Sequence, residues 1–453
     1  MSLRSGLAGL AAALLPLVAG AASLAAPPPP PPSAVLFENV RVFDGQSARL
    51  SGPSNVLVVG NLIQSISSQA IAAPAGTTLT RIQGGGRTLM PGLIDNHVHI
   101  ALSTTSQAEL LSPATTGEVL QARATAEAGD MLMRGFTSVR DMGGPLLTAR
   151  PAIDKGELPG PRIYASGAMI SQTSGHGDSR LPQERSRRFF GEVSKGEQLG
   201  ANYIADGRDE VLTATRENLR AGATQIKVMA GGGAASAYDP LDVTQYTLDE
   251  MKAAVEAASD WNTYVTVHAY TPRAVRRAVE AGVLCIEHGQ LLDEDTMKLL
   301  ADKSIWLSLQ VLDPAPPTAP ESTRLKKAQV IDGTSNAYLW AKKYGVKLAW
   351  GTDFLFDPRQ NARQAADILK LRQWFTPAEI LKMVTHDNAQ LLALSGPRNP
   401  YQAGKLGVVE AGAYADMLLV DGDPIANVDL IGDPAKNFVV IMKDGKVYKN
   451  TLR

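Results

Sequence analysis

The sequence predicts an α/β protein with a (β/α)8 TIM barrel and a small β-sandwich domain formed by both termini. A long middle region alternates apolar, strand-like runs with amphipathic segments, and short strand-like runs punctuated by glycine occupy both ends of the chain. The chain has 453 residues, of which 44% are hydrophobic and 20% are charged. This is an ordinary globular composition with enough apolar residues for a large core.

The first 26 residues are expected to lie outside the fold, as a secretory signal peptide. Arg4 supplies a positive charge, residues 6–20 are uncharged and rich in leucine and alanine, and small residues place cleavage sites after Ala21 or Ala25. The alternative is a permanent membrane anchor, but the stretch is short and alanine-rich for a bilayer span of about 20 strongly apolar residues. Residues 27–33 are expected to form a proline-rich spacer.

Both ends of the remaining chain are predicted to be β-structure. Residues 34–90 contain several short strand-like runs, and residues 399–453 show the same texture. Each set is short of core on its own, so we expect one β-sandwich assembled from the two ends rather than two separate small sheets.

Residues 91–398 are predicted to form the barrel. Amphipathic segments at 248–258, 272–281 and 362–371 separate candidate strands, as expected for repeated strand-helix units. A doubly wound open sheet is the principal alternative, but no Gly-x-Gly-x-x-Gly motif opens a helix after the first strand. The eight candidate strands are 89–99, 136–141, 162–167, 225–230, 264–270, 284–289, 305–310 and 347–353.

Charge and cysteine content exclude several functions. The formal net charge is −1, which gives no electrostatic case for binding nucleic acid or an anionic membrane surface. The single cysteine, Cys285, excludes an internal disulfide framework and a cysteine-based zinc site. A metal site must therefore draw on the six histidines of the chain and on its carboxylates.

His97 and His99 close the first candidate strand and form the most informative pattern. Residues i and i+2 of a strand point to the same side, so both imidazoles can bind one metal ion. A lone His-x-His is a weak signal, because two surface histidines meet it by chance. It becomes strong here because ligand-type residues also end other candidate strands.

Four such residues lie at or near the ends of other strands: Lys227, His268, His288 and Asp353. Barrel enzymes build their sites at the C-terminal ends of strands, so we expect these side chains to meet the first two histidines at one mouth. Imidazole and carboxylate ligands suit zinc and related divalent ions. Asp353 could instead cap a helix, but its position on the eighth strand favours a catalytic role in proton transfer.

Lys227 leaves two interpretations open. It could form an ion pair with a carboxylate. Alternatively, a CO2 adduct of its amine would be a carbamate, whose two oxygens could bridge two metal ions. A protonated ammonium cannot bind a cation, and burying it unpaired is costly. Two metals about 3.5–4 Å apart would activate a bridging water and polarise a carbonyl.

These residues together resemble the signature of the amidohydrolase superfamily. The resemblance covers nearly the whole chain after the signal peptide, through residues 91–99, 227, 268, 288 and 351–353, with flanking matches at 37–40 and 412–417. It implies a (β/α)8 barrel with a small β-sandwich from both termini. In the binuclear branch it also implies two divalent ions, expected to be zinc. One would be held by His97, His99 and Asp353, the other by His268 and His288, with a carboxylated Lys227 as the bridge.

The finer resemblance is to prolidase-like carboxypeptidases, and to bacterial amidohydrolases of that branch which cleave ochratoxin A, an amide of phenylalanine. The segment 174–178 carries it and implies that His176 contacts the substrate and helps to stabilise the oxyanion. Tyr238, in a glycine-rich loop, is the candidate for holding the substrate carboxylate. His176 could instead be an ordinary exposed loop residue. Lys227 distinguishes the chain from imidazolonepropionases, and the lack of a glutamate soon after His268 argues against an adenosine-type deaminase.

We therefore expect a metal-dependent amidase that releases the C-terminal amino acid from dipeptides or N-acyl amino acids, through attack by a metal-bridging hydroxide. The alternatives are a lactonase or cyclic-amide hydrolase with the same two metals, and a non-catalytic binding protein on the same barrel. The expected partner is a small-molecule or peptide substrate, with no nucleic acid and no stable membrane association after signal cleavage. The protein is expected to be secreted or periplasmic and homo-oligomeric.

Overall fold

The computed structural model describes residues 33–236 and 238–452. The predicted signal peptide and almost all of the proline-rich spacer lie outside these residues. Within the described part of the chain, no helix combines the length and the apolar character needed to cross a membrane.

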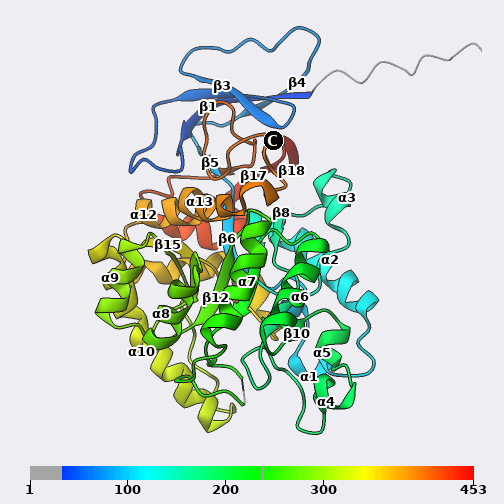
Figure 1. The fold of residues 1–453 in the computed structure, drawn as a ribbon. Helices are drawn as coiled ribbons and strands as arrows, with labels where there is room; N and C mark the ends of the chain where they lie inside the picture. Colours follow the sequence, from blue (N-terminus) through cyan, green and yellow to red (C-terminus); the bar gives the residue numbers. More distant parts are fainter. Residues whose placement is uncertain (1–32, 237, 453) are drawn as a thin grey trace, which may run out of the picture.

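One sheet draws its strands from both ends of the chain: β1 (Ser33–Val42), β2 (Ser54–Val59), β3 (Leu62–Ser67), β4 (Thr78–Gln83), β5 (Thr88–Pro91), β16 (Met417–Val420), β17 (Phe438–Lys443) and β18 (Lys446–Asn450). The strand order is β18-β17-β16-β5-β1-β2-β3, and β4 also pairs with β1. Because β16 pairs antiparallel with β5, the C-terminal strands continue the N-terminal sheet. This sheet lies at the top of Figure 1.

The middle of the chain forms two parallel sheets. The smaller has the order β6-β7-β8 and the larger the order β10-β9-β11-β12-β13-β14-β15. The backbone N–H of Asp353, just after β15, donates to the carbonyl of His97 in β6 over 2.8 Å. The last strand of the larger sheet therefore ends beside the first strand of the smaller one. The strands are β6 (Leu93–Val98), β7 (Phe136–Asp141), β8 (Arg162–Ala165), β9 (Met169–Ser171), β10 (Asn202–Ile204), β11 (Ile226–Met229), β12 (Val265–Ala269), β13 (Cys285–His288), β14 (Trp306–Leu309) and β15 (Lys347–Trp350).

Helices follow most of these strands. Two of the three amphipathic segments named above form continuous helices. One begins at a reciprocal cap between Thr247 and Glu250, and the other begins at Pro272 and ends at Gly282, which has a φ of 101°. The third, 362–371, is a short helix between two 3-10 turns. The helices are α1 (Gln107–Leu110), α2 (Gly117–Met133), α3 (Arg150–Asp154), α4 (Arg187–Phe190), α5 (Lys195–Gln198), α6 (Arg208–Arg220), α7 (Leu248–Asp260), α8 (Pro272–Ala281), α9 (Glu294–Asp302), α10 (Glu321–Tyr344), α11 (Gln364–Asp367), α12 (Pro377–Lys382), α13 (Asn388–Leu392) and α14 (Pro434–Asn437).

The first candidate strand, 89–99, is in fact two strands that belong to different sheets. They meet at Gly92, whose backbone N–H donates to the carbonyl of Asp416 over 2.9 Å. A Cβ atom at Gly92 would lie only 2.0 Å from Oγ1 of Thr137, so the close approach of the two segments requires glycine. Hydrophobic periodicity could not reveal this break, because every residue of both β5 and β6 is buried.

Strand β12 illustrates how the fold aims polar side chains at the site. Val265 and Val267 belong to the main apolar core, together with Ala254 of α7 and Ala278 of α8. Alternate residues of a strand point to opposite sides, so Thr266 and His268 face away from these helices. The apolar alternation therefore places the histidine on the side where the other predicted ligands gather.

Candidate metal centre

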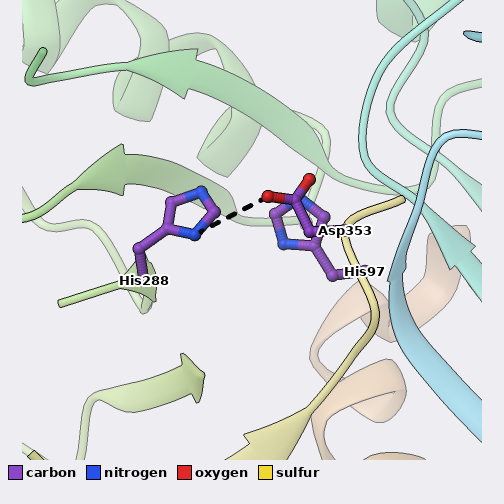
Figure 2. Close-up of side chains that lie close together, drawn as sticks. All are labelled: His97, His288 and Asp353. Atoms are coloured by element: carbon purple, nitrogen blue, oxygen red, sulfur yellow. Dashed lines mark ion pairs between the residues drawn. The ribbon is translucent and has the colours of Figure 1, made fainter. Parts of the chain in front are cut away.

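Three predicted histidine ligands gather around the carboxylate of Asp353. Oδ1 of Asp353 lies 3.3 Å from Nε2 of both His97 and His99, and Oδ2 lies 4.0 Å from Nδ1 of His288. One ligand atom from each of His97, His288 and Asp353 lies within 4.8 Å of the others (Figure 2). The fold thus brings together the ends of β6, β13 and β15, which are distant in the sequence.

The two remaining predicted ligands, His268 and Lys227, come from neighbouring strands. The ring of His268 lies 4.4 Å from that of His288, centroid to centroid. Its Nε2 donates to the carbonyl of Gly232 over 3.0 Å, which leaves Nδ1 available as a ligand atom. Lys227 is 1% exposed and lies opposite Thr266 in the pairing of β11 with β12. Burial lowers the pKa of Lys227.

The ion-pair interpretation of Lys227 has no support among the described residues. None of the ion pairs between described residues includes its amine, and it takes part in none of their hydrogen bonds. The charges of Glu287 and Asp353 nevertheless oppose the effect of burial on the pKa of Lys227.

Two buried nitrogen atoms show that the residues fit a metal ion. Nε2 of His97 and Nδ1 of His288 are both buried and have no hydrogen-bond partner among the described residues. A buried polar atom left without a partner costs about 1–3 kcal/mol. Both atoms lie beside the Asp353 carboxylate, and imidazole nitrogen with carboxylate oxygen is a donor set typical of zinc.

The backbone at two of these ligands is in the left-handed region. His288 has a φ of 77° and Asp353 a φ of 54°. Such conformations cost on the order of 1–3 kcal/mol for residues other than glycine and concentrate at functional sites. The fold therefore holds both residues in a strained backbone conformation, with their side chains directed toward each other.

A buried carboxylate fixes the orientation of His97. Oε2 of Glu287 lies 2.8 Å from Nδ1 of His97, and Oε1 accepts hydrogen bonds from Arg140 over 2.7 Å and from the thiol of Cys285 over 3.2 Å. The hydroxyl of Thr266 also donates to Oε1 over 2.5 Å. Burial acts to raise the pKa of Glu287, but Arg140 and His97 hold it well below its usual value. An ionised Glu287 requires the hydrogen of His97 on Nδ1, which leaves Nε2 free to bind a metal.

His99 is oriented in the same way by a backbone carbonyl. Its Nδ1 lies 2.8 Å from the carbonyl oxygen of Gly143, which can only accept a hydrogen bond. The hydrogen therefore sits on Nδ1, and Nε2 faces Asp353.

The electrostatics of the site favour the ligand form of each residue. Burial lowers the pKa of His97 to about 4 and holds those of His268 and His288 well below the usual value. These imidazoles are therefore neutral, as metal ligands must be. Although burial opposes it, the neighbouring histidines lower the pKa of Asp353, so this group is a carboxylate.

His176 lies directly against this cluster. Its ring stacks on that of His268 with centroids 3.9 Å apart and 21° between the planes. Nδ1 of His176 is 3.1 Å from Oδ2 of Asp239 and 3.1 Å from Oγ of Ser236. A Cβ atom at Gly233 would lie 1.8 Å from the His176 ring, which explains why this part of the loop is glycine. The ring of His176 therefore lies against the candidate site, and its side chain is only 17% exposed.

The two tyrosines near the site lie in different surroundings. Tyr238, the predicted carboxylate anchor, is 59% exposed. Tyr270 is 3% exposed, and its ring centroid lies 5.1 Å from that of His288 and 5.1 Å from that of His268. Sequence reasoning overlooked Tyr270, although its position two residues after His268 in the candidate strand 264–270 predicts that both point to the same side.

Glu287 and Asp239 were also overlooked as functional residues. Glu287 directly precedes the candidate ligand His288, but its partner His97 is 190 residues away in the sequence. Asp239 is 63 residues from His176, in a loop without regular periodicity. The sequence offered two weak signals. Glu287 lies next to a histidine at a strand end, and Asp239 lies shortly after a run of glycines.

Comparison with known proteins agrees with this geometry. Residues 88–450 match the amidohydrolase family, and the chain belongs to that family. It is a hydrolase, which sets aside the alternative of a non-catalytic binding protein.

Individual relatives are consistent with this class. Ochratoxinase from Aspergillus niger is 31% identical over 377 residues, which cover 80% of this chain and 75% of that protein. A crystal structure of a prolidase complexed with N-methylphosphonate-L-proline has a TM-score of 0.83 and 31% identity, covering 92% of this chain and 100% of the other. A crystal structure of a Xaa-Pro dipeptidase with bound methionine has a TM-score of 0.76 and 29% identity, over 92% and 100% of the two chains.

Proposed function

We propose that this protein hydrolyses the amide bond before a C-terminal amino acid, in dipeptides or N-acyl amino acids. The main observation in support is that His97, His99, His288 and Asp353 converge. Two of their ring nitrogens are buried without a hydrogen-bond partner among the described residues, and the cluster lies directly beside His176. The prolidase, dipeptidase and ochratoxinase relatives support an amide with a free C-terminal residue. Ochratoxin A, which would yield phenylalanine, is one candidate substrate.

The proposal includes two divalent ions, expected to be zinc. His97, His99 and Asp353 would hold the first ion, and His268 and His288 the second. Lys227, as its carbamate, would bridge the two. The absence of any ion pair to this buried lysine among the described residues favours the carbamate. When bound, the two ions supply a water activated for attack and polarise the scissile carbonyl.

Protein side chains complete the reaction. The carboxylate of Asp353 accepts the proton released by the attacking water and delivers it to the leaving nitrogen. His176, held through Nδ1 by Asp239, presents Nε2 to the carbonyl oxygen of the substrate. In its protonated form it donates a hydrogen bond to that oxygen as negative charge develops. Tyr238 stays a prediction as an anchor for the substrate carboxylate.

The proposal extends to architecture and setting. Residues 91–398 would form a closed (β/α)8 barrel, supported by the contact between the ends of β15 and β6. Residues 34–90 and 399–453 would form a β-sandwich; what supports this is the one sheet to which both segments contribute strands. The protein would be secreted or periplasmic, because of its N-terminal sequence, and homo-oligomeric.

A substrate panel tests the proposed function. Zinc-loaded enzyme is incubated with N-acetyl-L-phenylalanine, dipeptides, ochratoxin A and a lactone, and released amino acid is measured. We expect amino acid from the first three and little ring opening of the lactone. Hydrolysis of the lactone alone would replace the amidase with the lactonase or cyclic-amide hydrolase.

A further inference from the structure

The buried face of helix α10 changes its chemistry along its length. From Val330 to the C-terminus of the helix the inward positions are apolar or small: Val330, Thr334, Ala337, Tyr338 and Ala341 are all buried. Three and four residues before Val330, on the same face, stand Lys327 and Lys326. Both are partly buried, whereas the neighbouring Arg324 and Leu325 are exposed. Two cations therefore occupy positions where the helix otherwise buries apolar side chains.

Lys326 has a structural role that uses its charge. Its Nζ donates to the carbonyls of Ser236 over 2.6 Å and of Asp239 over 3.1 Å. These residues belong to the loop after β11 that holds His176 through Asp239. Lys326 thus ties α10 to the loop that supports the substrate-contacting histidine.

Lys327 reaches the loop after β14 instead, and its hydrogen-bonding capacity is almost unused. Its Nζ donates to the carbonyl of Asp313 at 3.5 Å, the limit of a hydrogen bond. An ammonium group carries three donors. The Asp313 carboxylate is already paired with Arg363 over 2.5 Å and Lys370 over 3.0 Å. No ion pair of the described residues includes Lys327.

This cation lies at the same end of the larger sheet as the candidate ligands. Lys327 contacts the loop after β14, and β14 is flanked by β13 and β15, whose C-terminal ends lead to His288 and Asp353. Burial lowers the pKa of Lys327, and the charges of Asp313 and Asp353 oppose that effect. Partial burial weakens solvent screening, so an anion that approached Lys327 would interact more strongly than at an open surface.

We propose that Lys327 binds the free carboxylate of the substrate and makes the enzyme selective for a negatively charged C-terminal residue. This inference rests on the proposed amide hydrolysis and assigns a specificity-determining residue to it. The carboxylate would accept hydrogen bonds from the two unused donors of Lys327, while Lys326 keeps the adjoining loop in place. The loops after β11 and β14, joined by α10, would then line the same substrate path.

The test compares one substrate with and without its charge. kcat and KM are measured for N-acetyl-L-phenylalanine and for its primary amide, with wild type, Lys327→Met, Lys327→Arg and Arg324→Met. A charge-assisted hydrogen bond contributes about 1.5–3 kcal/mol, so wild type is expected to prefer the free acid by about tenfold to hundredfold in kcat/KM. Lys327→Met should bring this ratio close to one, mainly by raising KM for the acid. Lys327→Arg should keep most of the preference. Arg324→Met removes a charge from the exposed side of the same helix and should leave the ratio unchanged.

Equilibrium binding gives a second readout that does not require turnover. Isothermal titration of the metal-loaded proteins with L-phenylalanine and L-phenylalaninamide should show weaker binding of the acid by Lys327→Met, and a smaller change for the amide. A general loss of structure would weaken both ligands together, and that result would overturn the assignment.

The outcomes separate this inference from the proposed function. If wild type hydrolyses neither compound nor any other amide of the panel, the proposed function fails and the inference fails with it. If wild type prefers the acid and Lys327→Met keeps that preference, amide hydrolysis stands and Lys327 is not the carboxylate-binding residue. Equal hydrolysis of acid and amide by wild type would likewise overturn the inference alone.

Discussion

His97 and Glu287, 190 residues apart in the sequence, are joined by a buried hydrogen bond of 2.8 Å between Nδ1 and Oε2. Both side chains are almost completely inaccessible to solvent. Because Arg140 keeps Glu287 ionised, the carboxylate determines which nitrogen of His97 carries the hydrogen. The metal-binding form of His97 is therefore built into the protein before any metal arrives.

Glu287→Gln should weaken metal binding. The amide can no longer act as an anionic acceptor for Nδ1 of His97, and such changes typically cost about tenfold to hundredfold in metal affinity or activity. Zinc affinity is measured by competition with a chromogenic chelator. Glu256→Gln, which breaks an exposed ion pair with Arg208, is the matched control and should retain wild-type affinity. Unchanged zinc affinity in Glu287→Gln would show that the hydrogen bond only packs the core.

Lys227→Ala should lose bound metal and activity. If a carbamate bridges two ions, its removal eliminates a ligand of both, and the rate should fall by about a hundredfold or more, beyond the usual cost of changing a residue that only orients a ligand. Metal content is measured by elemental analysis. Added propionate should restore part of the rate, and Lys298→Ala, at an exposed position, should behave like wild type. Wild-type metal content and rate in Lys227→Ala would exclude the carbamate.

Asp239→Asn should reduce turnover without removing metal. The substitution removes the charged partner of His176, which costs about 1.5–3 kcal/mol, or roughly tenfold to hundredfold in kcat/KM. Asp242 lies in the same loop at an exposed position, so Asp242→Asn is the control and should leave kcat/KM nearly unchanged. Hydrolysis of both the free acid and the methyl ester of N-acetylphenylalanine should slow, because His176 contacts the carbonyl in each.

Tyr238→Phe, by contrast, should slow hydrolysis of only the free acid if the Tyr238 hydroxyl anchors the carboxylate.

Chelation should abolish activity and lower the thermal midpoint. A ligand that binds only the folded state stabilises it by mass action, so its removal must destabilise the fold. Elemental analysis of freshly purified protein should find two ions per chain. Full activity at one ion per chain would refute the binuclear centre, and adding zinc back should restore both the rate and the midpoint.

Asp95 should make stability depend on pH. Burial raises its pKa from 3.8 to about 6. Between these values the folded protein keeps a proton that the unfolded chain releases, so the free energy of unfolding falls as pH rises through this window, by about 3 kcal/mol in total. Urea unfolding is followed by tryptophan fluorescence for wild type and Asp95→Asn. The difference between the two curves should slope between about pH 4 and pH 6 and be flat outside it. A flat difference throughout would mean that Asp95 has the same pKa in both states.

The convergence of the candidate ligands could be predicted from sequence because each ends an apolar run, and strand periodicity then gives its direction. His97, His99, His288 and Asp353 needed no knowledge of long-range contacts beyond the convergence of strand ends. The contacts of Glu287 and Asp239, and the role proposed for Lys327, could not be predicted in that way. Their roles depend on partners that only the folded chain brings close, and isolated charged residues are ordinarily solvated.

The fold itself was predictable at the level of alternating strands and helices. The break at Gly92 was not, because it depends on the approach of Thr137 from a neighbouring strand, and both halves of the segment are equally buried. The predicted amphipathic segment at 362–371 was longer than the helix found there, because only α11 is α-helical and 3-10 turns flank it on both sides.

The junction at Gly92 connects the C-terminal strands of the sheet to β6, the strand that leads to the candidate metal centre. The carbonyl of Asp416 holds the N–H of Gly92, and the carboxylate of Asp416 accepts a hydrogen bond from Arg162 in β8 over 2.7 Å. Shortening the protein from its C-terminus to before β16 would therefore do more than remove a peripheral sheet. It would leave the edge of β5 unpaired, which favours aggregation. It would also remove the hydrogen bond that holds Gly92, at the start of the strand that carries His97. Affinity tags and fusion partners at this end are best attached after the last strand, where they leave that anchorage intact.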